Sequence, residues 1–247
     1  MARPLRLWNF VRFVNDAVGS ASKYDIIEAH WLYPAGIAAM IASKITGTPY
    51  RVFCHGTDVM MSERSWLWRF WARRVVRHAK EVFAVSHFLA IKLSLIVKRG
   101  IRIHIQPMEV DKEIFFDRHQ DNRGYHPVTF INKSNAGKYE SLFYDLINKG
   151  LLPDNCFLFL KGNQYSQTKL SDYFNITEVV VLASENEGYG LMLAEAAECG
   201  SKIIGVNEGG IPEVVAKYGG QLFDGTAEDL MKKIDIALNI EKGAVLQ

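Results

Sequence analysis

Short apolar stretches alternate with longer amphipathic segments along almost the whole chain. The apolar stretches are rich in β-branched and aromatic residues and are mostly bounded by Gly, Pro, Asn or Ser, which is typical of strands. The predicted strands are Asp25–His30, Tyr50–Cys54, Glu81–Val85, Ile101–Ile105, Val128–Asn132, Phe157–Lys161, Glu178–Ala183, Lys202–Val206 and Gln221–Phe223. The predicted helices are Arg3–Val18, Pro34–Thr46, Ser65–His78, Ser86–Lys98, Lys138–Lys149, Tyr189–Cys199, Ile211–Tyr218 and Ala227–Asn239. Such alternation predicts an α/β fold with parallel sheets and right-handed crossovers.

The alternation is interrupted once, in a polar segment without apolar periodicity. Residues 117–126 carry many charged and polar side chains, and Pro127 then opens a new strand. Composition shifts of this kind mark domain boundaries. We therefore expect a first Rossmann-like domain over residues 1–116, a linker over 117–126 and a second Rossmann-like domain over 127–247.

Composition supports a folded protein in a reducing compartment. Of the 247 residues, 49% are hydrophobic and 23% are charged, which is globular rather than disordered composition. No apolar run approaches the roughly 20 residues of a membrane span, and the N-terminus lacks the apolar core of a signal peptide. Cys54, Cys156 and Cys199 are odd in number and widely spaced. They predict neither a disulfide framework nor a zinc site, and hence a cytoplasmic protein.

Candidate chemistry is concentrated after the strand that ends at Ala183. A glycine-rich turn containing Gly188 and Gly190 follows this strand, and a helix follows the turn. In open parallel sheets, ligands bind beyond the carboxyl ends of the strands. The free amides and partial positive charge of a helix N-terminus suit a phosphate there, and glycines let the backbone approach it closely.

Two glutamates flank this helix start. Glu187 lies in the turn, and Glu195 lies almost two helical turns further on. The pair can therefore reach two parts of one elongated ligand, and carboxylates accept hydrogen bonds from sugar hydroxyls. The alternative is a solvated loop glutamate together with an ordinary helix glutamate.

Three linked motifs in this region resemble a known family. Glu187-Gly-Tyr-Gly leads to Glu195, a Cys-Gly turn follows at Cys199, and Gly209-Gly-Ile-Pro-Glu comes next. Their order and spacing resemble the donor site of family four, the retaining group 1 glycosyltransferases of GT-B fold. The resemblance implies transfer of a sugar from a nucleotide-diphosphate donor, with Glu187 holding sugar hydroxyls and Glu195 the ribose. The implied diphosphate-binding amides are those of Gly188, Tyr189, Gly190 and Leu191.

The resemblance extends to a pair of lysines. Lys133 and Lys138 have the spacing of the basic pair that faces the donor diphosphate in the family. Fixed cations stabilise a leaving diphosphate as its negative charge develops. With two cations and a helix N-terminus, no metal ion and no other cofactor is expected, and there is no Asp-x-Asp to hold a metal. The alternative is that both lysines lie in a solvated loop.

The first half of the chain resembles the acceptor-side domain of the same family. His30 and His55 both end predicted strands, and Asp58 follows closely. In the family, the histidine before a glycine approaches the donor sugar. We therefore expect His55 to position the sugar, together with Glu187 and Lys138 as catalytic groups, and we expect His30 and Asp58 near the acceptor. A strand-end histidine with a purely structural role is the alternative.

Residues 62–80 form a segment rich in basic and aromatic side chains. It holds six Lys and Arg residues against one acidic residue, with Trp66, Trp68, Phe70 and Trp71 interleaved. Basic amphipathic helices with such aromatics are typical of membrane interfaces. The alternative is an aromatic stripe that faces the core. Nucleic acid is not an expected partner, because no binding motif is present and the net charge is only +2.

The expected protein is thus an abbreviated, metal-independent GT-B enzyme that transfers a hexose-type sugar with retention. The chain is short for the family, whose first strand would precede Met1. The expected acceptor is a sugar or a lipid-linked molecule, and the protein would then be peripheral on the inner membrane face. Two alternatives stay open: an inactive module that binds sugar nucleotides or membrane surfaces, and a nucleotide-sugar 2-epimerase of the same fold.

Overall fold

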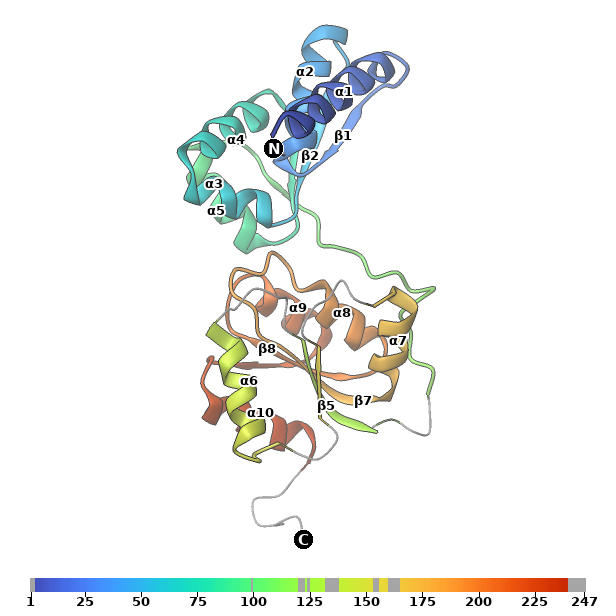
Figure 1. Cartoon of the computed structure of the whole chain (residues 1–247), viewed down its shortest axis with the longest axis vertical. Coiled ribbons are helices and arrows are strands. Elements are labelled where there is room, and N and C mark those ends of the chain that lie inside the picture. The colour runs from blue at the N-terminus through green and yellow to red at the C-terminus, as the bar shows by residue number, and fades with distance from the viewer. Residues whose placement is uncertain are drawn as a thin grey trace. The chain divides into compact units, whose positions relative to one another are not determined.

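The computed structural model describes residues 3–98, 100–119, 123, 125–131, 138–152, 156–159 and 165–239. The chain divides into two compact units, Met1–Pro107 and Met108–Gln247 (Figure 1). Each unit contains one parallel sheet and its own helices, as the hydrophobic pattern predicts. The predicted α/β architecture with two parallel sheets is therefore confirmed.

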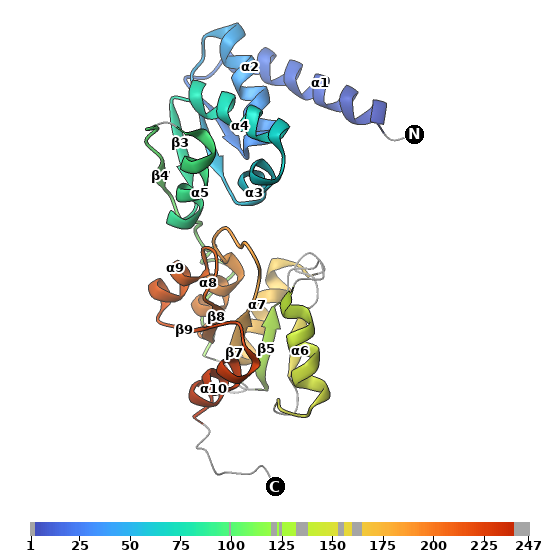
Figure 2. The ribbon, with the colours of Figure 1, turned by 90° about the vertical axis from the view of Figure 1, so that its left-hand side faces the viewer.

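The described part of the first unit contains a sheet in the order β1-β2-β3-β4. Its strands are β1 (Ile27–His30), β2 (Tyr50–Cys54), β3 (Glu81–Ala84) and β4 (His104–Ile105). Its helices are α1 (Arg3–Ala21), α2 (Ile37–Thr46), α3 (Thr57–Arg64), α4 (Trp66–His78) and α5 (His87–Val97), and a π-helical turn, η1 (Leu32–Gly36), precedes α2. Because the strands follow one another in chain order, right-handed crossovers place the connecting helices on one face. Figure 2 shows α3 and α4 on the same side of β3 and β4.

The two faces of this sheet differ in chemistry. The helix-covered face carries small and aliphatic side chains such as Val52, Val82 and Ala84, all of which are buried. The opposite face carries a row of neighbouring rings that crosses all four strands, with centroids 4.9, 4.7 and 5.2 Å apart; the first two pairs are stacked and the third is tilted. The row consists of His30, Phe53, Phe83 and His104, which are neighbours in the strand register.

The described part of the second unit contains a sheet in the order β6-β5-β7-β8-β9. Its strands are β5 (His126–Ile131), β6 (Phe157–Phe159), β7 (Thr177–Leu182), β8 (Lys202–Val206) and β9 (Gln221–Phe223). Its helices are α6 (Lys138–Asn148), α7 (Gln167–Ile176), α8 (Leu191–Glu198), α9 (Ile211–Tyr218) and α10 (Ala227–Ala237). Figure 1 shows α7, α8 and α9 on one face and α6 and α10 on the other.

The strand order of the second sheet reverses direction between β5 and β7. The chain leaves β5 through α6 toward β6, but it leaves β7 through α8 in the opposite direction toward β8. Such a topological switch point opens a crevice beyond the carboxyl ends of the two strands. Ile131 and Leu182, the last residues of β5 and β7, are direct partners in the ladder. The carboxyl ends of β5 and β7 therefore lie side by side.

Part of the segment predicted as a linker contacts the second unit. The side-chain carbonyl of Asn175 in α7 accepts a hydrogen bond from the backbone amide of Arg118 at 2.8 Å. The Asn175 amide group in turn donates to the carbonyl of Phe116 at 3.1 Å. Ser171, one turn earlier in α7, donates to the carbonyl of Ile114 at 2.6 Å. These bonds hold residues 114–118 against α7.

Two helices, α3 and α7, have no counterpart in the sequence prediction. Both are short, with 8 and 10 residues. In α7 the only fully apolar buried positions are Leu170 and Phe174, four residues apart, which is too brief a pattern to distinguish from a loop. Ser166 caps α7 by accepting a hydrogen bond from the Lys169 amide, which stabilises a helix of this length.

Candidate functional site

Two loops meet at the carboxyl edge of the sheet in the second unit. One follows β7 and contains Glu187, and the other follows β8 and contains Gly209 and Gly210. The Gly210 amide donates a hydrogen bond to the Glu187 carbonyl at 2.8 Å. A Cβ atom on Gly209 would lie 2.6 Å from that same carbonyl oxygen, and one on Gly210 would lie 2.3 Å from the carbonyl oxygen of Gly188. The loops therefore touch through backbone atoms, and only glycine fits at either position.

Helix α8 begins directly behind this contact. Gly190 takes φ 99°, in the left-handed region that favours glycine, and turns the chain into the helix at Leu191. The first amides of a helix have no carbonyl partner within the helix. The turn over residues 187–190 and the first turn of α8 thus form a cradle of backbone amides beside the switch point, suited to an anionic group.

The predicted donor-binding residues differ in position and in burial. Glu187 is half-buried in the turn, whereas Glu195 is buried within α8. The side chain of Tyr189 is only 2% exposed, and burial raises the pKa of its phenol. A ligand in the cradle can therefore reach Tyr189 through its backbone, while its ring packs in the core.

The lysine pair falls partly outside the described residues. Lys133 lies outside them, and Lys138 is described only as the first residue of α6. Tyr139, the next residue, is buried, and its hydroxyl donates to a carboxylate oxygen of Glu208 at 2.8 Å. This hydrogen bond connects the start of α6 to the loop after β8. Sequence reasoning did not identify Tyr139 or Glu208 as site residues. The one signal in the sequence is that Tyr139 directly follows Lys138, the second residue of the predicted basic pair.

A second cluster lies at the carboxyl ends of β1 and β2 in the first unit. Nδ1 of His30 and Nε2 of His55 are 2.9 Å apart, and the two rings stack with centroids 5.1 Å apart. Burial lowers the pKa of His55, the nearby His30 lowers it further, and Asp58 opposes both. At neutral pH, His55 is therefore an uncharged imidazole that can donate and accept hydrogen bonds.

Asp58 anchors the loops that carry the two histidines. Its side chain is 2% exposed. Its carboxylate accepts hydrogen bonds from the backbone amides of Leu32 at 2.9 Å and Gly56 at 3.1 Å. The two bonded amides belong to the loops after β1 and β2. Asp58 therefore positions this cluster, and its carboxylate oxygens are already engaged by the protein.

Acidic pH is expected to destabilise the protein through His55. Because the folded-state pKa lies below the ordinary value of 6.5, the unfolded state binds protons more readily, so stability falls as pH drops below about 6.5. The melting temperature should be lower at pH 5.5 than at pH 7.5, and this decline should be smaller in His55→Gln. His78→Gln, at an exposed position, is the control. An unchanged decline in His55→Gln would contradict this assignment.

Most of the basic segment forms α4, and two of its arginines bond carbonyls of neighbouring helices. Arg69 donates to the carbonyl of Glu63 at 2.8 Å, and Arg73 donates to that of Ile96 at 2.7 Å. Both bonds satisfy carbonyls at helix C-termini. Two aromatic side chains of α4 are solvent-exposed: Trp66 is 80% exposed and Phe70 is 47% exposed. Arg74 lies over the Phe70 ring at 5.6 Å. The aromatic residues of α4 thus do not all face the core.

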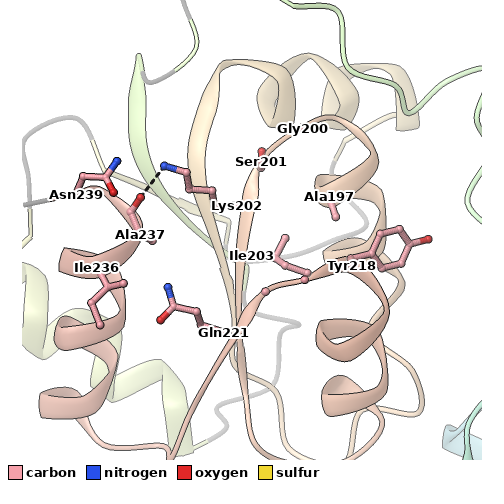
Figure 3. Close-up of a pocket in the computed structure, with 12 residues that line it drawn as sticks. Ala197, Gly200, Ser201, Lys202, Ile203, Tyr218, Gln221, Ile236, Ala237 and Asn239 are labelled. Atoms are coloured by element: carbon pink, nitrogen blue, oxygen red, sulfur yellow. Dashed lines mark hydrogen bonds between the residues drawn. The ribbon is translucent and has the colours of Figure 1, made fainter.

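A cavity of about 410 Å³ lies at the other end of the second sheet (Figure 3). It is lined by residues at the amino ends of β8 and β9 and at the end of α10, among them Lys202, Gln221 and Asn239. Lys202 donates to the carbonyl of Ala237 at 2.8 Å and pairs with Glu178. Its charge is thus already compensated, and the cavity is at the opposite end of the strands from the glycine loops.

Among the described residues, no helix is long and apolar enough to span a membrane. The described residues also contain no group of three or more His, Cys, Asp or Glu side chains with the geometry of a metal site.

Family models and relatives agree across most of the chain. Residues 1–107 match the glycosyl transferase 4-like domain, and residues 135–244 match the glycosyl transferases group 1. The chain is 25% identical to an uncharacterized glycosyltransferase of Methanocaldococcus jannaschii, over 88% of this chain and 66% of that protein. It is 26% identical to the N-acetyl-alpha-D-glucosaminyl L-malate synthase of Bacillus anthracis, over 80% of this chain and 60% of that protein. The chain therefore spans less than two thirds of the length of either relative.

Solved structures with the same fold include two from cyanobacteria. HepE of Anabaena, crystallised with UDP and glucose, matches with a TM-score of 0.75 and 17% identity, over 92% of this chain and 72% of that chain. Sucrose-phosphate synthase of Thermosynechococcus elongatus matches with a TM-score of 0.74 and 16% identity, over 97% of this chain and 71% of that chain.

Proposed function

The chain belongs to the group 1 glycosyltransferases and has their GT-B fold, and on this premise we propose that it transfers a sugar from a nucleotide-diphosphate donor to an acceptor hydroxyl with retention of configuration. The observation that carries the proposal is the cradle of backbone amides at residues 187–190 and the start of α8, which the contact with Gly209 and Gly210 holds in shape. It lies beside the switch point of the sheet, where open α/β folds bind nucleotides.

In the proposed reaction the cradle stabilises the leaving group. The amides of residues 188–191 would bind the diphosphate, and Lys133 and Lys138 would supply fixed positive charge as the sugar–phosphate bond breaks. This arrangement needs no metal ion. Preorganised donors are most effective where charge develops in the transition state, and the short loops held by Gly209 and Gly210 keep the amides in place.

Side chains around the cradle would orient the sugar and the nucleotide. Glu187 would accept hydrogen bonds from sugar hydroxyls, and Glu195 would hold the ribose. His55 of the first unit would position the sugar as a neutral imidazole, in keeping with its lowered pKa. The acceptor hydroxyl would attack the face of the sugar from which the diphosphate leaves, so the configuration is retained. The departing phosphate oxygen would accept the proton of that hydroxyl.

Donor binding by Glu187 is the direct test. Thermal shift and hydrolysis would be measured with UDP-, GDP-, ADP- and TDP-sugars, starting with UDP-glucose, because HepE was crystallised with UDP and glucose. We expect Glu187→Ala to weaken donor binding about 10- to 100-fold, because hydrogen bonds to a charged group are worth about 1.5–3 kcal/mol.

Glu185→Ala is the matched control, because this exposed glutamate lies in the same loop two residues earlier. It should bind the donor as the wild type does. Slow donor hydrolysis by the wild type would identify an enzyme and not a binding module. The absence of a shift with every donor would overturn the proposal.

We further propose that α4 attaches the protein to an anionic membrane surface, where it would meet a lipid-linked acceptor. Exposed Trp66 and Phe70 would insert at the interface, with Arg74 beside them. Aromatic insertion and cationic residues are the two contributions that hold amphipathic helices at anionic membranes. The support is that these rings are solvent-exposed and do not fill the core.

Removing the two rings tests this attachment. Trp66→Ala combined with Phe70→Ala should lower binding to phosphatidylglycerol vesicles at least about tenfold, because each buried ring contributes about 1.5–3 kcal/mol. Binding would be measured by vesicle sedimentation. Tyr24→Ala, which removes another highly exposed ring, should leave vesicle binding unchanged. Equal binding of the double variant and the wild type would exclude α4 as the attachment site.

A further inference from the structure

Trp31 has a backbone conformation that aromatic residues rarely adopt. It follows β1 directly, with φ 74° and ψ 146°. Positive φ brings Cβ into steric conflict with the backbone, and for a bulky residue it is a true outlier. Such outliers persist only when the surrounding structure enforces them, and they cluster at functional sites.

The surrounding structure does enforce this conformation. The Trp31 amide donates to the carbonyl of Phe53 at 2.8 Å, and the Trp31 carbonyl accepts from the Gly36 amide at 3.0 Å. The next residue, Leu32, is fully buried, and its amide donates to the carboxylate of Asp58. Backbone bonds on both sides therefore hold the residue in place, while its side chain stays outside the core.

The side chain lies at the candidate site of the first unit. The indole is 49% exposed. Its ring centroid is 5.1 Å from that of His55, at an angle of 49°. His55 in turn contacts His30. An exposed indole beside two hydrogen-bonding imidazoles, at the carboxyl edge of a parallel sheet, combines an apolar flat surface with adjacent polar groups.

This combination matches the chemistry of a pyranose ring. One face of a pyranose presents mainly C–H groups, while its hydroxyls point outward around the rim. A flat aromatic ring buries the apolar face at a low conformational cost, and imidazole nitrogens can bond the hydroxyls. Leucine or valine at this position would offer area without a flat surface.

We propose that Trp31 is the platform on which a sugar ring of the acceptor stacks, with His55 beside it. The proposal rests on the function proposed above and names its acceptor class as a carbohydrate. The proposal also gives a reason for the unusual backbone. At a negative φ the Trp31 side chain would leave the backbone in another direction, and the indole would no longer lie beside His55.

Direct binding is measured by the indole N–H resonances of the ¹⁵N-labelled protein. Methyl glycosides of glucose, galactose, mannose and N-acetylglucosamine would be titrated to about 100 mM, since single-ring contacts give millimolar affinities or weaker. The Trp31 resonance is assigned with Trp31→Phe. We expect it to shift saturably with at least one glycoside, while the resonances of exposed Trp8 and Trp66 stay constant.

Trp31→Gly separates the role of the ring from that of the backbone. Glycine adopts positive φ without strain, so this variant removes the indole and keeps the native backbone conformation at residue 31. Transfer to the glycoside identified by titration should show a KM raised about tenfold, while kcat changes less than KM. Trp31→Phe keeps a smaller ring, and its acceptor KM should lie between those of the wild type and Trp31→Gly.

The outcomes separate this proposal from the proposed function. A Trp31 resonance unaffected by every glycoside would overturn the platform, whatever the donor experiments show. An unchanged acceptor KM in Trp31→Gly would also overturn it. Absence of any donor shift, together with saturable movement of Trp31, would overturn the transferase and retain the carbohydrate platform.

Discussion

Replacing Asp58 with asparagine is expected to lower the free energy of unfolding by about 2–3 kcal/mol. The carboxylate is buried, and each of its oxygens accepts one hydrogen bond, from the backbone amide of Leu32 or of Gly56. Asparagine is nearly the same size, but it must turn its NH₂ group toward one of these amides. One strong hydrogen bond is then replaced by two opposed donors in a site without solvent, and a buried unsatisfied donor is costly.

Urea denaturation followed by circular dichroism measures this loss. Asp16→Asn is the control, because Asp16 is an exposed residue of α1 and its replacement should change stability by less than about 0.5 kcal/mol. The Asp58 variant should also lose transferase activity, since both loops that carry the histidine cluster depend on it. If the two variants unfold at the same urea concentration, Asp58 does not anchor the loops.

Gly210→Ala is expected to abolish donor binding. Its Cβ would lie 2.3 Å from the carbonyl oxygen of Gly188, 2.8 Å from the carbonyl carbon and 3.0 Å from Cα of Tyr189. All three atoms belong to the backbone, so no flexible side chain can move aside. The two loops must separate, which costs about 1–3 kcal/mol of stability and displaces the amides of the cradle. We expect donor affinity to fall at least about 100-fold.

The donor thermal-shift assay also measures this effect. Gly19→Ala supplies the comparison, because a Cβ there meets no atom within 4 Å and the residue lies inside α1. That variant should bind donor normally and gain up to about 1 kcal/mol in stability, because alanine is the better helix former. Normal donor affinity in Gly210→Ala would show that the loop contact is not needed for the cradle.

Strand positions were predictable because the buried strands of parallel sheets are short, apolar and clearly bounded. Each of the nine predicted strands overlaps an observed strand, and Tyr50–Cys54, Lys202–Val206 and Gln221–Phe223 agree at both ends. Helices were predictable where an apolar face recurs over several turns. The start of α2 was placed too early, at Pro34, because η1 precedes it and Tyr33 is extended. Such local backbone geometry has no signature in apolar periodicity.

The candidate site was predictable where chemistry follows local order along the chain. Glu187, the glycine turn and α8 are consecutive along the chain, so the order of strand, turn and helix at this edge of the sheet could be predicted. The contacts between His30 and His55 and between Tyr139 and Glu208 join residues 25 and 69 positions apart. They depend on strand register and helix placement. The role of Trp31 depends on one backbone angle, which no residue pattern encodes.

The meeting of the two glycine loops through their backbones has an evolutionary consequence. Because the contact consists of main-chain atoms of residues 187–189 and 209–210, it does not use the side chain of Glu187 or of the exposed Asn207. Point mutations of those side chains therefore leave the backbone contact between the loops intact. Mutations of Gly209 or Gly210 place a Cβ against the backbone of the facing loop and force the two loops apart. Selection to keep the loop contact therefore acts on the two glycines, whereas substitutions of Glu187 and Asn207 can accumulate among descendants without loss of the scaffold.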